Sequence, residues 1–302
     1  HLPKIVAAVP TLCAVMWAAA AAQQQPGLVR GEIGARLDGY LSRLVPYGFS
    51  GAVLVAKDGA IVLEKGYGLA NRETGQPYTA DMVSSIGSIT KQFTAAAILR
   101  LEMDGRLRAT DPISRHLPGV PEDKAAITIH HLLTHTAGFS GDLGGADIDP
   151  IERDALVAKV LAAPLASAPG ERFEYSNEGY SLAGAIVERV AGTGYETYLR
   201  EHLFLPAGMK DTGYLLPSWA VERMPLGYTG DGKPWGRVYR NHWLGDGPGW
   251  YLRANGGIHS AVGDLYRWHL ALEGTKVLPA AAVSAFQEGH VASGGGERYA
   301  YG

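Results

Sequence analysis

The sequence predicts an α+β protein in which a β-hairpin comes early and helices and loops follow. Residues 51–70 contain two β-branched, apolar runs on either side of Lys57-Asp58-Gly59, and an Asp-Gly pair supplies the positive φ angles of a tight hairpin turn. Residues 88–105 have the apolar spacing of a helix. The 40 glycines among 302 residues indicate many turns and loops, which argues against a simple helical bundle.

The composition is that of a globular protein with a sizeable core. Of the 302 residues, 46% are hydrophobic and 19% are charged, enough for one large domain or two small ones. The 27 Lys and Arg residues against 30 Asp and Glu residues give a formal net charge of −3, so no basic excess points to a nucleic-acid partner. Cys13 is the only cysteine, which excludes an intramolecular disulfide and a thiolate zinc cluster.

The first 22 residues are typical of a secretory signal peptide. Lys4 precedes an uncharged apolar stretch at 5–22, which ends in Ala20-Ala21-Ala22, a small-residue cleavage site. The alternative is a membrane anchor, although Pro10 and the alanine-rich end favour the signal. We therefore expect a secreted or periplasmic protein without a stable membrane span after signal removal, and residues 23–45 to form a linker and a lead-in helix.

A helix is predicted to start at Ser88. Ile89, Phe93, Ala97 and Leu101 recur at four-residue intervals, and Gly105 is a plausible stop. These apolar positions predict a buried face.

Shorter helices and loops are predicted downstream. Residues 127–135 suggest a short helix, and a longer one runs from Asn177 to Gly192 with Ser176 or Asn177 as its cap. Residues 225–257 are rich in Gly, Trp and Tyr without periodicity, which predicts long loops.

Ser88 and Lys91 form an S-x-x-K tetrad at the start of the predicted helix. Lys91 is the only charged residue between Asp81 and Arg100, so we expect it to be buried, with its pKa lowered from about 10.4 towards neutrality. The spacing places both side chains on one helix face, where a desolvated amine can activate a serine nucleophile. The alternative is a capping serine with a surface lysine.

Tyr175-Ser176-Asn177 is a Y-x-N triplet just before a predicted helix. A tyrosine close to a cationic lysine can move protons, and an asparagine amide can hold a substrate carbonyl. The alternative is a packed tyrosine followed by an N-capping asparagine.

Four stretches together resemble the penicillin-recognising serine hydrolases, and within them the class C β-lactamase-like branch with its D-alanyl-D-alanine peptidases and esterases. They are 87–101, 130–139, 169–180 and 255–268, and the resemblance covers about residues 46–302 as one hydrolase domain. It implies an antiparallel sheet flanked by helices, with an inserted, mostly helical subdomain.

The resemblance also implies a mechanism without cofactor or metal. Ser88 would be the acylated nucleophile, Lys91 its proton acceptor, Tyr175 the general base or acid, and Asn177 a substrate contact. The substrate would be a small molecule or peptide with an amide or ester bond, such as a D-alanyl peptide, an ester or a β-lactam. The alternative is a non-catalytic protein of the same fold that binds or senses cell-wall peptides or β-lactams.

One family feature is not found. A third motif, Lys-Thr-Gly or a His-x-Gly-like variant, is expected on a strand beyond residue 302, and His259-Ser260-Ala261 does not match it. We therefore expect a domain truncated at its C-terminus, with strands missing, which is poorly active or inactive because one oxyanion donor would be lost.

Two further motifs have weaker signals. His131-x-x-x-His135 has the spacing of a zinc-binding helix, but Leu132 stands where a metalloprotease has glutamate, so we expect a structural role. Asn255-Gly256-Gly257 is expected to let the backbone approach the site closely, with a plain turn as the alternative.

Overall fold

The computed structural model describes residues 27–141, 143–237 and 243–302, which form helices and small antiparallel sheets, and this confirms the α+β prediction. The predicted signal peptide, residues 1–22, lies outside the described residues. Among those that are described, no helix has both the length and the hydropathy needed to cross a bilayer.

The helices are α1 (Gly31–Leu44), α2 (Thr90–Met103), α3 (Ile129–Leu133), α4 (Arg153–Ala162), α5 (Asn177–Ala191), α6 (Tyr195–Leu199), α7 (Leu205–Ala207), α8 (Val262–Glu273) and α9 (Ala280–Gln287). The strands are β1 (Leu28–Val29), β2 (Gly51–Lys57), β3 (Ala60–Tyr67), β4 (Leu69–Asn71), β5 (Gln76–Pro77), β6 (Ser84–Ser85), β7 (Thr212–Gly213), β8 (Gly227–Tyr228), β9 (Pro234–Gly236), β10 (His259–Ser260), β11 (Val291–Gly294) and β12 (Glu297–Tyr299).

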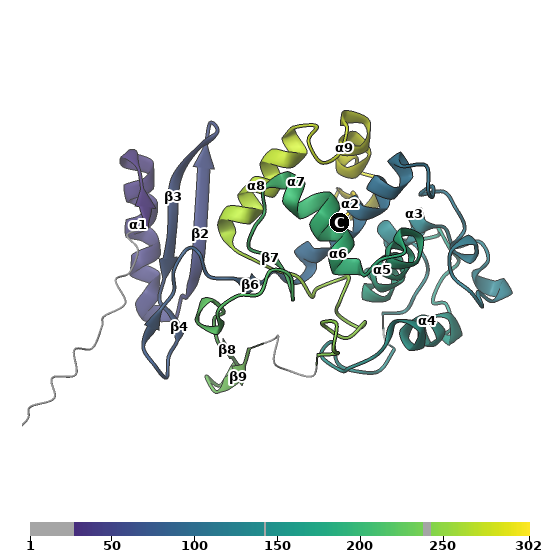
Figure 1. The fold of residues 1–302 in the computed structure, drawn as a ribbon, viewed down its shortest axis with the longest axis horizontal. Coiled ribbons are helices and arrows are strands. Elements are labelled where there is room, and N and C mark those ends of the chain that lie inside the picture. Colours follow the sequence, from purple (N-terminus) through teal and green to yellow (C-terminus); the bar gives the residue numbers. More distant parts are fainter. Residues whose placement is uncertain (1–26, 142, 238–242) are drawn as a thin grey trace, which may run out of the picture.

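The predicted hairpin is confirmed as β2 and β3. They pair antiparallel in a sheet of order β1-β3-β2, and Asp58 and Gly59 at the turn have φ angles of 50° and 75°. The predicted lead-in helix is α1, which packs closely on β3 because Gly34 has no side chain. A Cβ there would lie 2.4 Å from the carbonyl oxygen of Val62. Figure 1 shows this sheet between α1 and the helical part of the molecule, with α8 facing β2.

Helix α2 passes through the main hydrophobic core. Phe93, Ala97 and Leu101 are buried as predicted, and the residues between Phe93 and Leu99 are buried as well. Ile89 does not follow the pattern and is 41% exposed. It lies on the 3-10 turn Gly87–Ile89, so it precedes the regular helix and does not share its buried face.

Helix α5 has the ends that its sequence predicts. The Ser176 hydroxyl accepts the N–H of Gly179 at 3.1 Å, and Gly192 closes the helix in the left-handed conformation at φ 71°. Helix α3 is shorter than the predicted 127–135, because the chain leaves it after Leu133 and His135 takes φ 56°.

A small antiparallel sheet of order β6-β10-β7 joins three distant parts of the sequence. His259 pairs with Ser85 on one side and with Gly213 on the other, and both residues of β10 are buried. Just before it, the Ile86 N–H donates to the Ile258 carbonyl at 3.1 Å. The segment leading to Ser88 is therefore fixed to the segment that follows Asn255.

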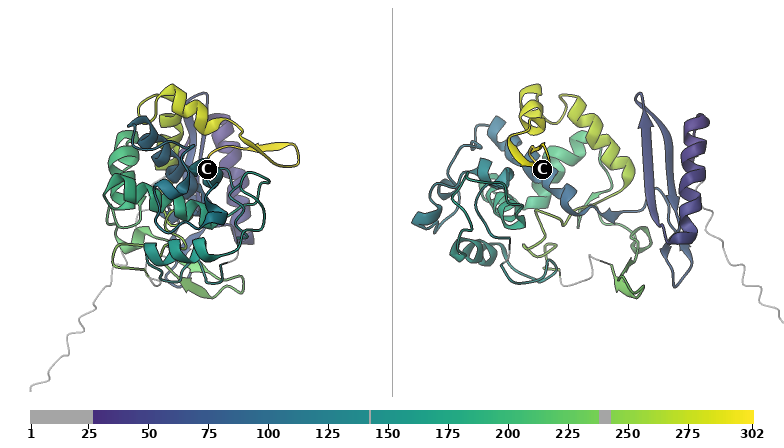
Figure 2. Two further views of the ribbon diagram at one scale, coloured as in Figure 1. Left: turned by 90° about the vertical axis from the view of Figure 1, so that its right-hand side faces the viewer. Right: turned by 180° about the vertical axis from the view of Figure 1, so that it is seen from behind.

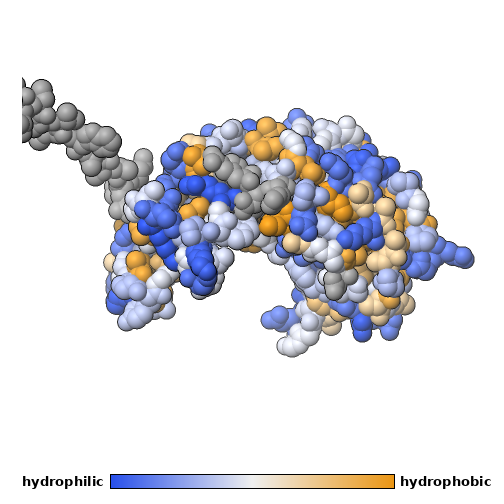
Figure 3. All heavy atoms as spheres, turned by 90° about the horizontal axis from the view of Figure 1, so that it is seen from below, coloured by the Kyte–Doolittle hydropathy of each residue, from blue (hydrophilic) through white to orange (hydrophobic). Residues whose placement is uncertain are grey.

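The C-terminal hairpin of β11 and β12 is attached through two tyrosines at its base. The Tyr301 hydroxyl lies 2.6 Å from Nδ1 of His130, and the Tyr299 hydroxyl lies 3.1 Å from Nε2 of His135. Figure 2 shows the yellow hairpin extending away from the helical part. On the face seen from below, hydrophobic residues lie scattered among hydrophilic ones (Figure 3).

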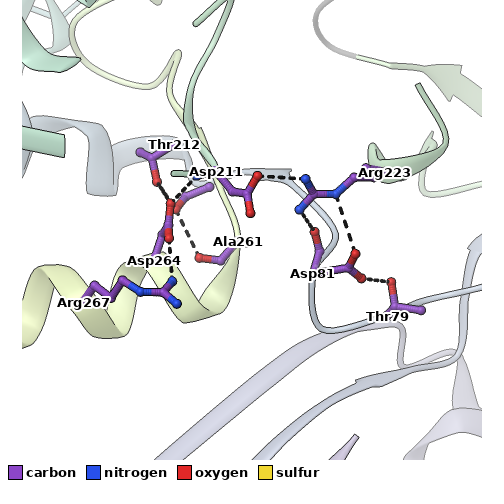
Figure 4. Close-up of polar contacts among 9 residues, drawn as sticks. Thr79, Asp81, Asp211, Thr212, Arg223, Ala261, Asp264 and Arg267 are labelled. Carbon is purple, nitrogen blue, oxygen red and sulfur yellow. Dashed lines mark hydrogen bonds and ion pairs between the residues drawn. The ribbon is translucent and has the colours of Figure 1, made fainter. Parts of the chain in front are cut away.

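A pocket of about 630 Å³ lies beside the small sheet and is lined by charged residues of β3, α8 and the loops near β7. Figure 4 shows that the charges of α8 and of the loops pair with one another. The carboxylate of Asp264 accepts the Asp211 N–H at 2.6 Å, the Thr212 hydroxyl at 2.8 Å and the Arg267 guanidinium at 2.7 Å. Because Thr212 lies on β7, this buried carboxylate ties β7 to the start of α8.

We expect Asp264→Asn to lower the free energy of unfolding by about 3 kcal/mol, because the amide cannot replace a buried carboxylate with three donors. Urea unfolding at neutral pH measures the loss. The matched control is Asp81→Asn, whose side chain is 66% exposed and 3.7 Å from Arg223, and which should cost less than about 1 kcal/mol. Equal losses in the two variants would contradict the assignment.

Candidate active site

Ser88 stands where the chain turns into α2. It lies exposed on the 3-10 turn Gly87–Ile89, while Lys91, three residues later, is only 1% exposed. The helical spacing brings both side chains to one face, with Lys91 Nζ 3.2 Å from Ser88 Oγ. The structure thus brings together the pair that the sequence predicts.

The Lys91 ammonium has three hydrogen-bond acceptors from three parts of the chain. Nζ donates to Ser88 Oγ at 3.2 Å, to Asn177 Oδ1 at 2.8 Å and to the backbone carbonyl of Asn255 at 2.9 Å. An ammonium has three N–H bonds, so each proton has an acceptor. The alternative of a surface lysine is excluded by this burial.

Burial lowers the pKa of Lys91 from 10.5 to about 8, because removing the ammonium from water disfavours its charged form. The negative charges of Asp147 and Glu178 act in the opposite direction and favour the ammonium. The direction is the one expected from the apolar sequence around the lysine.

Tyr175 approaches Ser88 from the segment before α5. Its hydroxyl donates to Ser88 Oγ at 2.9 Å, and its ring centroid lies 4.8 Å from Lys91 Nζ. The side chain is 44% exposed, so the phenol borders the solvent and not the core. Ser88 Oγ therefore has an amine on one side and a phenol on the other.

Asn177 is the first residue of α5, and its side chain faces Lys91. The sequence offers Ser176 or Asn177 as the N-cap of this helix. The cap is Ser176, whose hydroxyl accepts a helix N–H. The Asn177 amide oxygen is therefore free of the cap and accepts from the lysine.

Asn255 is a site residue whose partner the sequence does not identify. Its Nδ2 donates to Ser181 Oγ at 2.9 Å and to the Tyr251 carbonyl at 2.7 Å, which fixes the carbonyl that Lys91 uses. The Asn-Gly-Gly motif predicts a close backbone approach, and the structure shows one. A backbone acceptor has no side-chain signature, however, so its contact with Lys91 could not be foreseen.

The two histidines of the zinc-like spacing do not form one site. His131 Nδ1 accepts the Thr128 N–H at 3.3 Å, whereas His135 Nδ1 accepts the Ser176 N–H at 3.0 Å. Within residues 27–141, 143–237 and 243–302 there is no cluster of three or more His, Cys, Asp or Glu side chains arranged to hold a metal.

The geometry suits nucleophilic acyl transfer. An exposed hydroxyl lies at the N-terminus of a helix, within hydrogen-bond reach of an amine with a lowered pKa and of a phenol. Free N–H groups and the dipole at a helix N-terminus favour negative charge beside that hydroxyl.

The chain is similar to known proteins over most of its length. The family model described as Beta-lactamase matches residues 37–301. A Bacillus subtilis (strain 168) protein named as penicillin-binding protein PbpX is 36% identical over 183 residues, which are 59% of this chain and 44% of that protein. Esterase EstB of Burkholderia gladioli is 33% identical over 224 residues, 67% of this chain and 56% of the esterase.

A solved structure shares the fold. The crystal structure of a penicillin binding protein from Bacillus halodurans superposes with a TM-score of 0.73 at 28% identity, over 85% of this chain and 81% of that one. This confirms the fold class that the sequence resemblance implies. The chain spans about half the length of the two curated relatives. Because the family model matches most of its residues, the chain belongs to the Beta-lactamase family.

Proposed function

We propose that the chain is a serine hydrolase that cleaves an amide or ester through an acyl-enzyme on Ser88. The observation that carries this proposal is the position of Ser88 Oγ, with Lys91 Nζ at 3.2 Å and the Tyr175 hydroxyl at 2.9 Å. A serine hydroxyl is a weak nucleophile alone, and a base within hydrogen-bond distance removes its proton during attack.

Lys91 is the proton acceptor in this proposal. When the amine is neutral, its two N–H groups can still donate to Asn177 Oδ1 and to the Asn255 carbonyl. The lone pair then points to the remaining position, which is Ser88 Oγ. As Ser88 attacks the substrate carbonyl, its proton moves to Nζ and the carbonyl electron pair moves to oxygen. The resulting oxyanion is stabilised by the Ser88 N–H at the start of α2.

Tyr175 relays protons between Lys91 and the leaving group in acylation, and between water and Lys91 in deacylation. The tetrahedral intermediate collapses, the bond to the leaving group breaks, and the proton passes from Lys91 through the phenol to the leaving atom. In deacylation, water attacks the carbonyl carbon of the acyl-enzyme and its proton passes to the phenol and Lys91. The bond between the acyl carbon and Ser88 Oγ then breaks, the proton returns to Oγ, and the acid product leaves. Asn177, whose amide already contacts Lys91, is proposed to contact the bound substrate.

The substrate class follows from the relatives as a proposal. One relative is named a penicillin-binding protein and another an esterase, which supports a scissile C–N bond of an amide or C–O bond of an ester. A signal peptide at residues 1–22 would place the enzyme outside the cytoplasm, where cell-wall peptides and β-lactams are found.

We expect Ser88→Ala to abolish covalent labelling by a fluorophosphonate or a fluorescent penicillin, and to lower nitrophenyl ester turnover by at least about 10³-fold, because the attacking oxygen is removed. In-gel fluorescence and nitrophenol release measure the two effects. Ser84→Ala, on β6 before the turn, controls for the loss of a nearby hydroxyl.

Labelling that survives in Ser88→Ala would show that the nucleophile is another residue. A stable penicillin adduct on the wild type, without ester turnover, would instead support the binding or sensing alternative.

The acylation rate should rise with pH because Lys91 must be neutral to accept the serine proton. With the pKa of Lys91 at about 8, kcat/KM for a nitrophenyl ester is expected to be half-maximal near pH 8 and to level off above it. The rate is measured from acid to alkaline pH after subtraction of spontaneous hydrolysis. A flat profile across pH 8 would rule out Lys91 as the base.

Lys91→Met should remove a pH-dependent part of the stability. Between pH 8 and 10.5 the unfolded chain binds a proton that the folded chain has released, so the wild type gains stability as pH rises. We expect its free energy of unfolding, relative to Lys91→Met, to increase by up to about 3 kcal/mol across this interval. Urea unfolding at several pH values measures it, with Lys57→Met as the control for one lost charge. A constant difference would contradict the lowered pKa.

A further inference from the structure

One histidine holds the chain on both sides of Tyr175. The Glu174 N–H donates to the backbone carbonyl of His135 at 2.8 Å, and the Ser176 N–H donates to its Nδ1 at 3.0 Å. The residues immediately before and after the tyrosine are therefore fixed to the same residue, forty positions earlier in the chain.

The His135 ring also packs against the phenol itself. The two rings are stacked, with centroids 4.3 Å apart and an interplanar angle of 29°. His135 is 1% exposed and has φ 56°, a left-handed conformation that is uncommon for a residue other than glycine. Strained backbone of this kind persists only where the surrounding structure holds it, and such residues gather at functional sites.

The hydrogen bonds define the protonation of the ring. Because Nδ1 accepts the Ser176 N–H, the proton of the neutral imidazole is on Nε2, which donates to the Tyr299 hydroxyl at 3.1 Å. Burial, and next the positive charge of Lys91, lower the pKa of His135 to about 3. The ring is thus neutral at any pH at which the site works.

We propose that His135 is a positioning residue that holds the Tyr175 phenol against Ser88. The proposal rests on the proposed function, in which that phenol transfers the proton. This role requires a ring that stacks on the phenol and also accepts the Ser176 N–H. Phenylalanine lacks the acceptor, and asparagine lacks the ring. A carboxylate would supply an acceptor, but its charge would favour the ammonium form of Lys91.

A double-mutant cycle with Tyr175 tests this role. His135→Phe keeps a ring and removes the acceptor, and we expect it to lower kcat for a nitrophenyl ester 10- to 100-fold with little change in KM. In the Tyr175→Phe background the same change should lower kcat less than about 2-fold, because the phenol is already gone. His135→Asn, whose Oδ1 occupies the Nδ1 position and which tolerates a positive φ, should recover part of the loss. Equal losses in both backgrounds would overturn the proposal.

The matched control is His131→Phe. His131 is a second histidine of the same segment and also accepts a backbone N–H, but from Thr128 and not from the segment of Tyr175. We expect its kcat to equal that of the wild type once the folded fraction is taken into account. A coupling with Tyr175 as large as that of His135 would show that any damage to this segment has the same effect.

Nitrogen-15 NMR of the wild-type ring separates this inference from the proposed function. We expect His135 to show the neutral tautomer with hydrogen on Nε2 from pH 5 to 9, whether or not the protein turns over an ester. A ring that becomes protonated between pH 5 and 7, or carries its proton on Nδ1, would overturn the inference without variants. Turnover that persists in Ser88→Ala would instead reject the proposed function and leave the NMR result to decide on His135.

Discussion

The site depends on the removal of one ammonium from water. A buried cation is costly, and its cost is reduced only by acceptors for its protons. Lys91 finds them on Ser88, on Asn177 and on the backbone of Asn255. They lie at the start of α2, at the start of α5 and in the loop before β10. These three segments must therefore be in place together before the lysine can be buried, which links folding of the core to assembly of the site.

The small sheet explains how such short segments are kept in place. Strand β10 has two residues, and on its own it would contribute little rigidity. It pairs on both edges, however, and Asp264 binds the neighbouring Thr212 and the backbone of Asp211 (Figure 4). The carbonyl of Asn255 precedes this strand by a few residues, so its position relative to Lys91 depends on pairings outside the site.

The sequence predicts those parts of the structure that depend on local chemistry. The hairpin follows from Asp58-Gly59, and the closeness of Ser88 and Lys91 follows from helical spacing, which the structure confirms. Contacts made by backbone atoms could not be predicted, because the carbonyl of Asn255 looks like any other. The spacing of His131 and His135 is that of a zinc-binding helix, but Leu132 already favours a structural role for them. The partners of His135 could not be predicted, because the sequence shows neither its left-handed conformation nor its contact with the distant Ser176.

A neutral neighbour suits a lysine that must lose its proton. Asp147 and Glu178 already favour the ammonium form of Lys91, and burial has to exceed their effect to bring the pKa to about 8. A further carboxylate in the place of His135 would add to the opposing charge, and a protonated histidine would repel the ammonium at a cost to folding. A buried imidazole avoids both effects while it accepts the N–H next to Tyr175. The same lack of water that lowers the pKa of the lysine therefore also fixes the charge state of the residue that orients its partner.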